Sequence, residues 1–214
     1  MREDVKRVQR TATRRGEQVR ATCRRIVDAA TALLIENGYS STTLDQIAEN
    51  AGVAVQTVYF HFGNKRTVLK QALDVAAVGD DEPVPVLERP WLQQAQTESD
   101  PHRVVALWVE TSRAILDRSA PIMRVVRDAA TGDAEMADLW ATNEQQRDIS
   151  YRLMAQQLTD RGALKADIPV DEAADVIYAM LSLEAYLLFT VSRKWTPERW
   201  QHWTTRSLTA AMLR

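Results

Sequence analysis

Cysteine is almost absent from this chain of 214 residues, which contains only Cys23. A single cysteine cannot form an internal disulfide, so the disulfide-stabilised scaffolds common among secreted proteins are excluded. The N-terminal segment lacks the apolar core of a signal peptide. The most apolar stretch, residues 179–191, contains Glu184 and is too short to span a bilayer. These absences predict a cytoplasmic protein.

Catalytic and metal-binding motifs are absent as well. The histidines number only three (His61, His102 and His202) and lie far apart in the sequence. No HExxH, GxSxG, phosphate-binding loop or cysteine-ligand spacing occurs. A redox switch at Cys23 would require an exposed thiol of low pKa. We therefore expect neither an enzyme nor a cofactor nor a metal site, and a catalytic all-helical protein remains an alternative.

Charge is unevenly distributed along the chain, although its net value is only −2. Residues 1–70 contain 12 Lys or Arg against 7 Asp or Glu, whereas residues 71–214 contain 15 against 22. Most of the basic excess precedes Ile26. A basic N-terminal segment followed by an acidic remainder is typical of a protein that binds a polyanion. From charge alone, a solvated N-terminal tail is the simpler alternative.

Apolar residues recur with helical spacing along most of the chain and predict an all-α fold of about nine helices without strands. The first helix is expected around Ile26 and ends at Asn37-Gly38. The others are expected near residues 44–51, 55–62, 65–79, 102–118, 121–131, 133–160, 171–193 and from Thr196-Pro197 onward. Residues 80–101 contain four prolines and predict an irregular connector pinned by Trp91.

Residues 44–62 have the layout of a helix-turn-helix. Ala48 is small enough for a close helix crossing, and Gly52 can adopt the positive φ of a tight turn. Three apolar residues are expected to set the angle between the helices: Ile47, Val53 and Val58. Val58, Tyr59 and Phe62 are expected to face the packing, and Gln56, Thr57, Phe60 and His61 to project outward. Such a projecting face suits readout of the major groove, and a helical hairpin within a core remains the alternative.

The run GVAVQTVYFHFGNKRTVL, residues 52–69, resembles the DNA-binding signature of the TetR (tetracycline repressor) family. The preceding Asn37-Gly38-Tyr39, Thr42-Thr43-Leu44 and Ile47-Ala48 also match, so this resemblance covers about residues 23–73. Leu183-Glu184-Ala185-Tyr186 and residues 195–199 resemble the family less specifically. The resemblance implies a basic arm (1–22), a helix-turn-helix domain (23–70) and a helical ligand-sensing and dimerisation domain (71–214).

The resemblance further implies a ligand-responsive transcriptional regulator, most simply a repressor, that binds a palindromic DNA operator. The expected DNA contacts are Thr42, Thr43, Val55, Gln56, Thr57, Tyr59, Phe60, His61 and Lys65. Thr42, Thr43 and Lys65 are expected to bind phosphate. Ala54 departs from the family, which usually has a capping hydroxyl residue there. The arginines of the arm either enter the flanking minor groove or form a disordered tail.

A palindrome requires two copies of the reading helix, so a homodimer is expected. Its interface is predicted to include Ile177, Met180, Leu181, Glu184, Leu188, Trp200, Trp203, Leu208 and Met212, although the same residues could fill a monomer core. A small-molecule effector is expected at Trp108, Met123, Arg127, Trp140, Asn143, Glu144, Arg147, Tyr151 and Tyr178. Core packing is the alternative for each apolar member. A constitutive DNA-binding protein without an effector also remains open.

Overall fold

The computed structural model describes the backbone of residues 2–79 and 84–214, and the side chains of residues 16–79 and 84–214. Within these ranges the chain is helical, and the only β pairing is an isolated antiparallel bridge between Leu164 and Leu213. The predicted all-α fold is confirmed. The contacts divide the chain into two compact units, residues 1–74 and 75–214.

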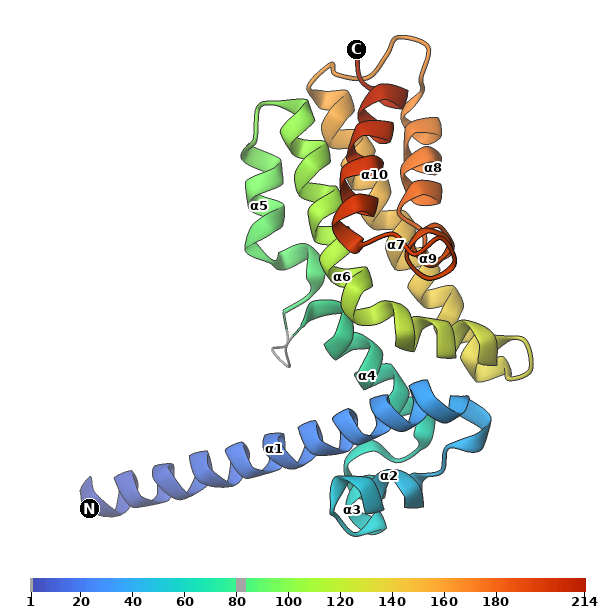
Figure 1. Ribbon diagram of the computed structural model, residues 1–214. Coiled ribbons are helices and arrows are strands. Elements are labelled where there is room, and N and C mark those ends of the chain that lie inside the picture. Colours follow the sequence, from blue (N-terminus) through green and yellow to red (C-terminus); the bar gives the residue numbers. More distant parts are fainter. Residues whose placement is uncertain (1, 80–83) are drawn as a thin grey trace. The chain divides into compact units, whose positions relative to one another are not determined.

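The N-terminal unit contains α1 (Arg2–Ser41), α2 (Leu44–Ala51), α3 (Val55–Phe62) and the first part of α4 (Lys65–Val78). Helix α1 begins at Arg2 rather than near Ile26 (Figure 1). The segment before Ile26 has no clear apolar stripe, but it contains no proline and is rich in residues of high helix propensity. Regular helical geometry is interrupted at Gly38 (φ 79°, ψ 170°), where the sequence predicts the stop.

The helix-turn-helix is built as its sequence predicts. Ile47 and Val58 are fully buried and Ala48 is 3% exposed, so the two short helices meet through these side chains. Gly52 ends α2 in the left-handed region (φ 63°, ψ 42°), and its N–H donates to the carbonyls of Ala48 and Glu49. The buried side chains and this turn together fix the angle at which α3 leaves α2.

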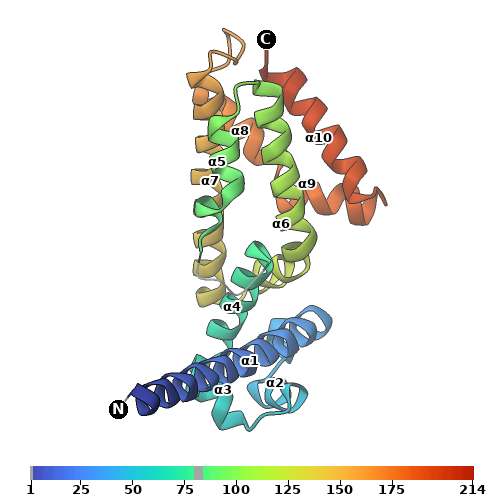
Figure 2. The same cartoon turned by 90° about the vertical axis from the view of Figure 1, so that its left-hand side faces the viewer.

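The C-terminal unit packs its helices lengthwise (Figures 1 and 2). Its elements are the 3₁₀ turn η1 (Val86–Glu88), α5 (Pro90–Thr97), α6 (Pro101–Ala130), α7 (Ala134–Asp160), α8 (Val170–Met180), α9 (Leu183–Leu187), the π-helical η2 (Leu188–Ser192) and α10 (Pro197–Met212). The predicted starts at Asp133 and Thr196 are confirmed, because each side chain accepts a hydrogen bond from a backbone N–H of the first turn. The predicted stop at Gly162 (φ 61°) is confirmed too.

Two predicted boundaries in this unit are wrong. The helices expected at 102–118 and 121–131 form the single α6, which continues through Pro121. Proline removes one hydrogen-bond donor without ending the helix, and Figure 1 shows that α6 bends in its second half. The helix expected at 171–193 is divided, because Ser182 adopts an extended conformation and its Oγ accepts a hydrogen bond from the N–H of Ala185.

The connector is more ordered than its four prolines predict, since α5 lies within it. The Nε1 of Trp91 donates to the carbonyl of Val86 (3.1 Å), and the Trp91 ring meets the Trp108 ring edge-on at 4.9 Å. Arg161, after α7, donates to the carbonyls of Ala95, Gln96 and Glu98 at 2.8–3.1 Å. An arginine distant in sequence thus satisfies the carbonyls at the end of α5.

By length and composition alone, Val170–Ser192 is apolar enough to cross a membrane, with a mean hydropathy of 1.5. This segment is not one straight helix, because it is broken at Leu181 and Ser182. Helix α8 packs against α7 and α10, and α9 packs against α6. The apolar side chains that make the segment hydrophobic therefore include core residues of the C-terminal unit.

Candidate DNA-reading surface and effector site

Helix α3 presents an exposed row of neutral side chains. Gln56 is exposed, Tyr59 is 51% exposed and Phe60 is 84% exposed, whereas Val58 on the opposite side is completely buried. Thr57 and His61 are half-buried at the edges of this row. Tyr59 is more exposed than the sequence predicts. A large aromatic ring left in solvent on a short helix is unusual unless another molecule covers it.

The start of α3 lacks a side-chain cap. Ala54 occupies the N-cap position (φ −69°, ψ 142°) and provides no side-chain hydrogen bond. Helix α2, in contrast, begins with a complete capping box, in which Thr43 Oγ1 accepts from the Gln46 N–H and the Gln46 side chain accepts from the Thr43 N–H. The first turn of α3 is therefore less well fixed than that of α2.

Replacing Ala54 with serine is expected to raise the free energy of unfolding of the N-terminal unit by about 1 kcal/mol. The new hydroxyl would accept a hydrogen bond from an unsatisfied N–H in the first turn of α3. Chemical denaturation followed by circular dichroism measures this change, with Ala54→Val as the control that cannot cap. Equal stability of the serine and valine variants would contradict this account.

Thr42 does not present its side chain to DNA. Only 1% of this residue is exposed, and its hydroxyl donates to the carbonyl of Gly38 at 2.9 Å. The expectation that the Thr42 side chain binds phosphate is therefore wrong, because its hydroxyl holds the α1–α2 connection. Thr43 is exposed at the start of α2 and remains a candidate for phosphate binding.

Lys65 also points to the α1–α2 connection. Its Nζ donates to the carbonyls of Tyr39 (2.5 Å) and Thr42 (2.7 Å) and lies 4.1 Å from the centre of the Tyr39 ring. The prediction of a phosphate contact is corrected to a positioning role, since these carbonyls and this ring already hold the ammonium group. Lys65 thereby joins the first turn of α4 to the segment that precedes α2.

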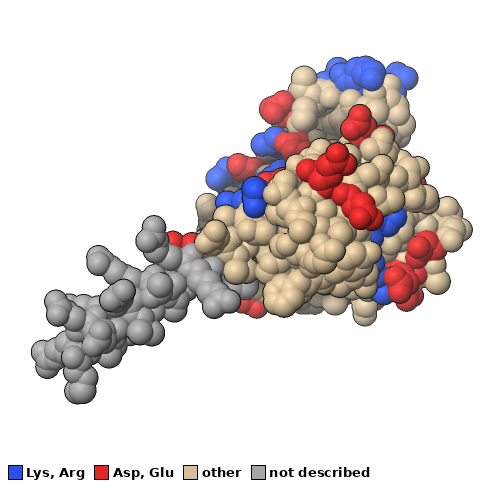
Figure 3. All heavy atoms as spheres, turned by 90° about the horizontal axis from the view of Figure 1, so that it is seen from below, with Lys and Arg blue, Asp and Glu red and all other residues tan. Residues whose placement is uncertain are grey.

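The reading segment itself carries no Lys or Arg. Residues 42–64 contain the carboxylates of Asp45 and Glu49 and no permanent cation. In Figure 3, neutral side chains cover most of the face in view, with both acidic and basic groups around them. Attraction to phosphate must therefore come from residues outside this segment.

Comparison with known proteins agrees with this geometry. Residues 26–72 match the family model described as bacterial regulatory proteins of the tetR family. The transcriptional regulator YdeS of Bacillus subtilis is 25% identical over 158 residues, which are 73% of this chain and 74% of YdeS.

Solved structures share the fold. NalD of Pseudomonas aeruginosa, the secondary repressor of the MexAB-OprM multidrug efflux pump, aligns with a TM-score of 0.69 and 22% identity over 92% of this chain and 98% of NalD. A transcriptional regulator of Saccharomonospora viridis in complex with choline aligns with a TM-score of 0.68 and 17% identity, over 90% of this chain and 97% of that one.

The chain carries the DNA-binding domain of the TetR family at residues 26–72. It is a DNA-binding transcriptional regulator rather than an enzyme, and the helix-turn-helix predicted at residues 44–62 is the family's DNA-binding element. Burial raises the pKa of the Cys23 thiol, which is the opposite of what a reactive cysteine needs. Among the described residues, no cluster of three or more His, Cys, Asp or Glu is placed to hold a metal ion.

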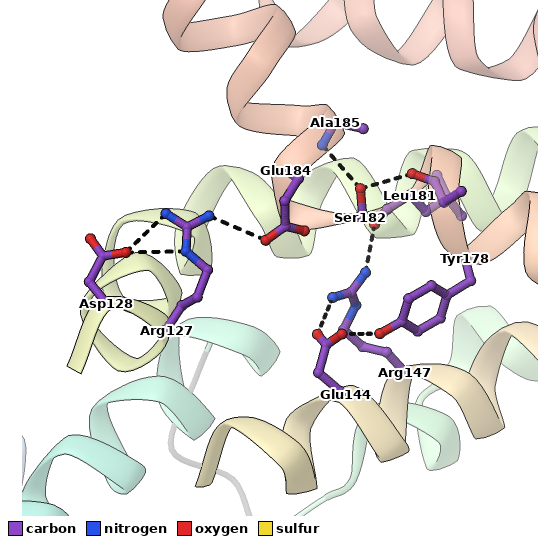
Figure 4. Close-up of polar contacts among 10 residues, drawn as sticks. Arg127, Asp128, Glu144, Arg147, Tyr178, Leu181, Ser182, Glu184 and Ala185 are labelled. Carbon is purple, nitrogen blue, oxygen red and sulfur yellow. Dashed lines mark hydrogen bonds and ion pairs between the residues drawn. The ribbon is translucent and has the colours of Figure 1, made fainter. Parts of the chain in front are cut away.

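Four of the expected effector residues of this TetR regulator come together between α7 and α8, and Figure 4 labels Glu144, Arg147 and Tyr178 among them. Arg147 pairs with Glu144 at 2.6 Å, and the hydroxyl of Tyr178 donates to the other oxygen of Glu144. Tyr151 and Tyr178 meet edge-on at 6.0 Å, with the Arg147 guanidinium 4.9 Å from the centre of the Tyr178 ring. We call these four residues the α7–α8 cluster.

The electrostatics of the α7–α8 cluster keep its proton donors protonated. Burial, together with the hydrogen bond to Glu144, raises the pKa of Tyr178. Burial works against the charge of Arg147, but Tyr151 and Glu144 nearby raise its pKa above the ordinary value. The Tyr151 hydroxyl (3.2 Å) and Arg147 Nη2 (3.5 Å) both donate to the carbonyl of Leu181, where α8 ends.

The other expected effector residues are not part of this cluster. Arg127 pairs with Glu184 on α9 at 3.2 Å and with Asp128 at 3.0 Å (Figure 4). Trp108 and Met123 are 2% and 4% exposed and belong to the packed core, so their assignment to an effector site is corrected. Trp140 and Asn143 are half-buried on α7. The Oδ1 of Asn143 is buried without a hydrogen-bond partner among the described residues.

Five of the nine predicted interface residues are core residues of one chain. Ile177, Leu181, Trp200, Leu208 and Met212 are all fully buried, so they cannot contact a second copy. Each helix has more than one apolar side, and the spacing alone does not show which side faces the core.

The remaining predicted interface residues are accessible. Leu188 is 53% exposed, and Met180 and Trp203 are half-buried. Glu184 is exposed, although Arg127 holds it within the chain. Sequence reasoning missed Val191, which is 48% exposed, and Phe189, whose ring lies 4.6 Å from that of Trp203. We call the exposed Leu188 and Val191, together with the half-buried Met180, Phe189 and Trp203, the candidate dimer surface.

Sequence reasoning also missed a hollow in the C-terminal unit. It has a volume of about 580 Å³ and is lined by the end of α4, the segment from Val86 to Gln94, and one side of α6. None of the nine expected effector residues lines it. The available signal was the side of α6 on which Arg103, Leu107, Ala114 and Arg118 recur at intervals of four or seven residues.

Proposed function

We propose that this TetR regulator is a cytoplasmic, ligand-responsive repressor that binds a palindromic operator as a homodimer. The exposed row on α3 carries the proposal, because Gln56, Tyr59 and Phe60 project from a helix whose other side is anchored by Val58. A glutamine amide can pair with adenine, and the aromatic rings can contact thymine methyl groups or phosphates.

Homodimerisation is supported by the candidate dimer surface defined above. Its large apolar side chains on α8, η2 and α10 are costly to leave in water, and a second copy would cover them. Two reading helices related by a twofold axis would address half-sites about 34–36 Å apart. A dimer would therefore both cover the apolar side chains and place two reading helices at the spacing of a palindrome.

We assign the α7–α8 cluster to effector recognition. An effector with a hydrogen-bonding group would compete with the Glu144–Arg147–Tyr178 contacts, which also hold the carbonyl end of α8 through Leu181. Since α8 leads directly to α9 and the candidate dimer surface, a rearrangement there would alter the spacing of the reading helices. A coupling of about 1–3 kcal/mol would weaken DNA binding roughly 5- to 150-fold.

The test is to isolate DNA fragments bound by the purified chain from its source genome, and to footprint them with and without candidate effectors. We expect protection of a palindrome near the chain's own gene and release by at least one small molecule. Binding that no molecule releases would favour the constitutive alternative. Failure to protect any double-stranded DNA would contradict the whole proposal.

Replacing Leu188 with glutamate is expected to raise the dimer dissociation constant by about tenfold, because a charge would be buried between two copies. Ile149→Glu is the matched control, since Ile149 is also 53% exposed but lies on α7. Sedimentation velocity over a concentration series measures both. Equal dimer affinities of the two variants would place the interface elsewhere.

Operator affinity is expected to fall less steeply with salt when residues 1–15 are removed. The slope of log affinity against log salt concentration should become shallower by about 0.9 for each phosphate that these residues neutralise. The reason is that residues 42–64 contain no Lys or Arg, while residues 2–15 contain six. The side chains of residues 1–15 lie outside the described part of the structure. Fluorescence anisotropy at several salt concentrations measures the slope, and an unchanged slope would favour the tail alternative.

A further inference from the structure

The hollow of about 580 Å³ in the C-terminal unit is separate from the α7–α8 cluster and shares no residue with it. Its volume falls within the range of small-molecule sites, roughly 300–1,000 Å³. All its lining residues lie between Ala77 and Arg118, so it belongs to one compact unit. Its walls combine apolar surface with charged side chains.

The apolar part of the lining can hold the body of a ligand. It comprises Val78, Val86, Pro90, Trp91, Leu107 and Ile115, together with the small residues Ala77 and Ala114. The Trp91 ring is held in place by its hydrogen bond to Val86 and by its edge-on contact with Trp108. A fixed indole beside small side chains is suited to packing against a flat or aliphatic group.

The charged part of the lining favours an anion. Among the described residues, Arg89, Arg103 and Arg118 line the hollow with one carboxylate, that of Glu110. The excess of positive charge over an apolar wall attracts a monoanion, and Glu110 makes the hollow less favourable for a dianion.

Arg118 has the geometry of a preorganised carboxylate donor. Its Nε and Nη2 donate to the carbonyls of Ala76 (3.1 Å) and Ala77 (2.9 Å), so it caps the end of α4. A guanidinium carries five N–H groups, and within the described part of the chain two of those of Arg118 donate hydrogen bonds, one from Nε and one from Nη2. One N–H of Nη1 and the second N–H of Nη2 remain available for a bidentate contact with a carboxylate.

Gly79 allows this arrangement. A Cβ on Gly79 would lie 3.1 Å from Arg118 Nε and 3.2 Å from its Cζ. Gly79 also adopts a φ of 88°, in the left-handed region that disfavours side chains. The absent side chain lets the guanidinium lie flat against the end of α4.

We propose that this hollow binds a monocarboxylate with a flat or aliphatic apolar body. The carboxylate accepts one hydrogen bond from Nη1 and one from Nη2 of Arg118, and the body packs against Trp91 and α6. Because the same guanidinium caps α4, which continues into the DNA-binding unit, occupancy of the hollow modulates DNA affinity. This last consequence rests on the proposed function, whereas binding itself does not.

The test is isothermal titration of the full chain, without DNA, with 1-naphthoate, benzoate and octanoate. We expect at least one to bind with a dissociation constant below about 1 mM. The uncharged alcohol of the same body should bind at least tenfold more weakly. Absence of binding by all three carboxylates, or equal affinity for the alcohol, would overturn the proposal.

Variants locate the site. Arg118→Lys keeps the positive charge but removes the planar pair of N–H donors, so it is expected to weaken carboxylate binding about tenfold. Ala114→Phe should abolish binding by filling the hollow, and Glu110→Gln should tighten it by removing the opposing charge. Arg124→Gln on the same helix and Tyr178→Phe in the α7–α8 cluster are controls that should bind normally. Normal affinity of both Arg118→Lys and Ala114→Phe, or weakened binding in the Tyr178→Phe control, would place the ligand elsewhere.

Discussion

Replacing Lys65 with methionine is expected to lower the free energy of unfolding of the N-terminal unit by about 3 kcal/mol or more. The change removes two hydrogen bonds from a charged donor to the carbonyls of Tyr39 and Thr42, each worth about 1.5–3 kcal/mol, while the methionine stem keeps part of the packing. It also removes the contact of the ammonium with the Tyr39 ring, worth about 0.5–1 kcal/mol.

The same variant separates positioning from phosphate binding. If Lys65 positions α4 against the α1–α2 connection, operator affinity falls but its dependence on salt is unchanged. If Lys65 instead bound phosphate directly, its loss would make the slope of log affinity against log salt concentration shallower by about 0.9. The free energy of unfolding would then be nearly unchanged. Lys70→Gln is the control, because Lys70 is exposed on the same helix, where it pairs with the exposed Asp74. Wild-type stability of Lys65→Met would contradict the positioning role.

Replacing Gln56 with alanine is expected to cost about 1–3 kcal/mol of operator affinity and to relax the preference at particular bases. Gln56 is exposed in the row on α3, where its amide can donate to and accept from one base edge. Competition binding against operators changed one base pair at a time measures the effect position by position.

The pattern of weakened binding distinguishes base reading from a damaged fold. A destabilised α3 would weaken all sequences alike, so circular dichroism must show unchanged helix content in the Gln56→Ala variant. Gln145→Ala, on α7, is the control for a glutamine in the other unit. Retention of the full base preference by Gln56→Ala would show that the assigned reading face is incorrect.

Local signals in the sequence were sufficient for the turn and the helix crossing of the helix-turn-helix. Gly52, the Thr43–Gln46 capping box and the uncapped Ala54 act through backbone geometry within four residues, so each can be recognised without knowledge of distant partners. Ile47 and Val58 followed from helical spacing, because a short amphipathic helix has only one side that can be buried.

Long-range partners explain the incorrect predictions. Lys65 appears in sequence as a cation at a helix start, and only the fold brings the carbonyls of Tyr39 and Thr42 within 2.7 Å of it. Pro121 signals a helix boundary, but the packing of α6 against α7 and α10 retains one bent helix. Ile177 and Trp200 fit an interface or a core equally well until their neighbours are known.

The amino-acid sequence by itself determined the helical fold, the helix-turn-helix and the family, because these depend on periodicity and on backbone conformations set by near neighbours. Only the tertiary structure decided which apolar residues remain on the surface, that α7 and α8 bring Glu144, Arg147, Tyr151 and Tyr178 together, and that Arg118 caps α4 beside a hollow. Those outcomes depend on contacts between residues far apart in the sequence, such as Arg118 with Ala76 and Arg147 with Tyr178, and no local pattern specifies them.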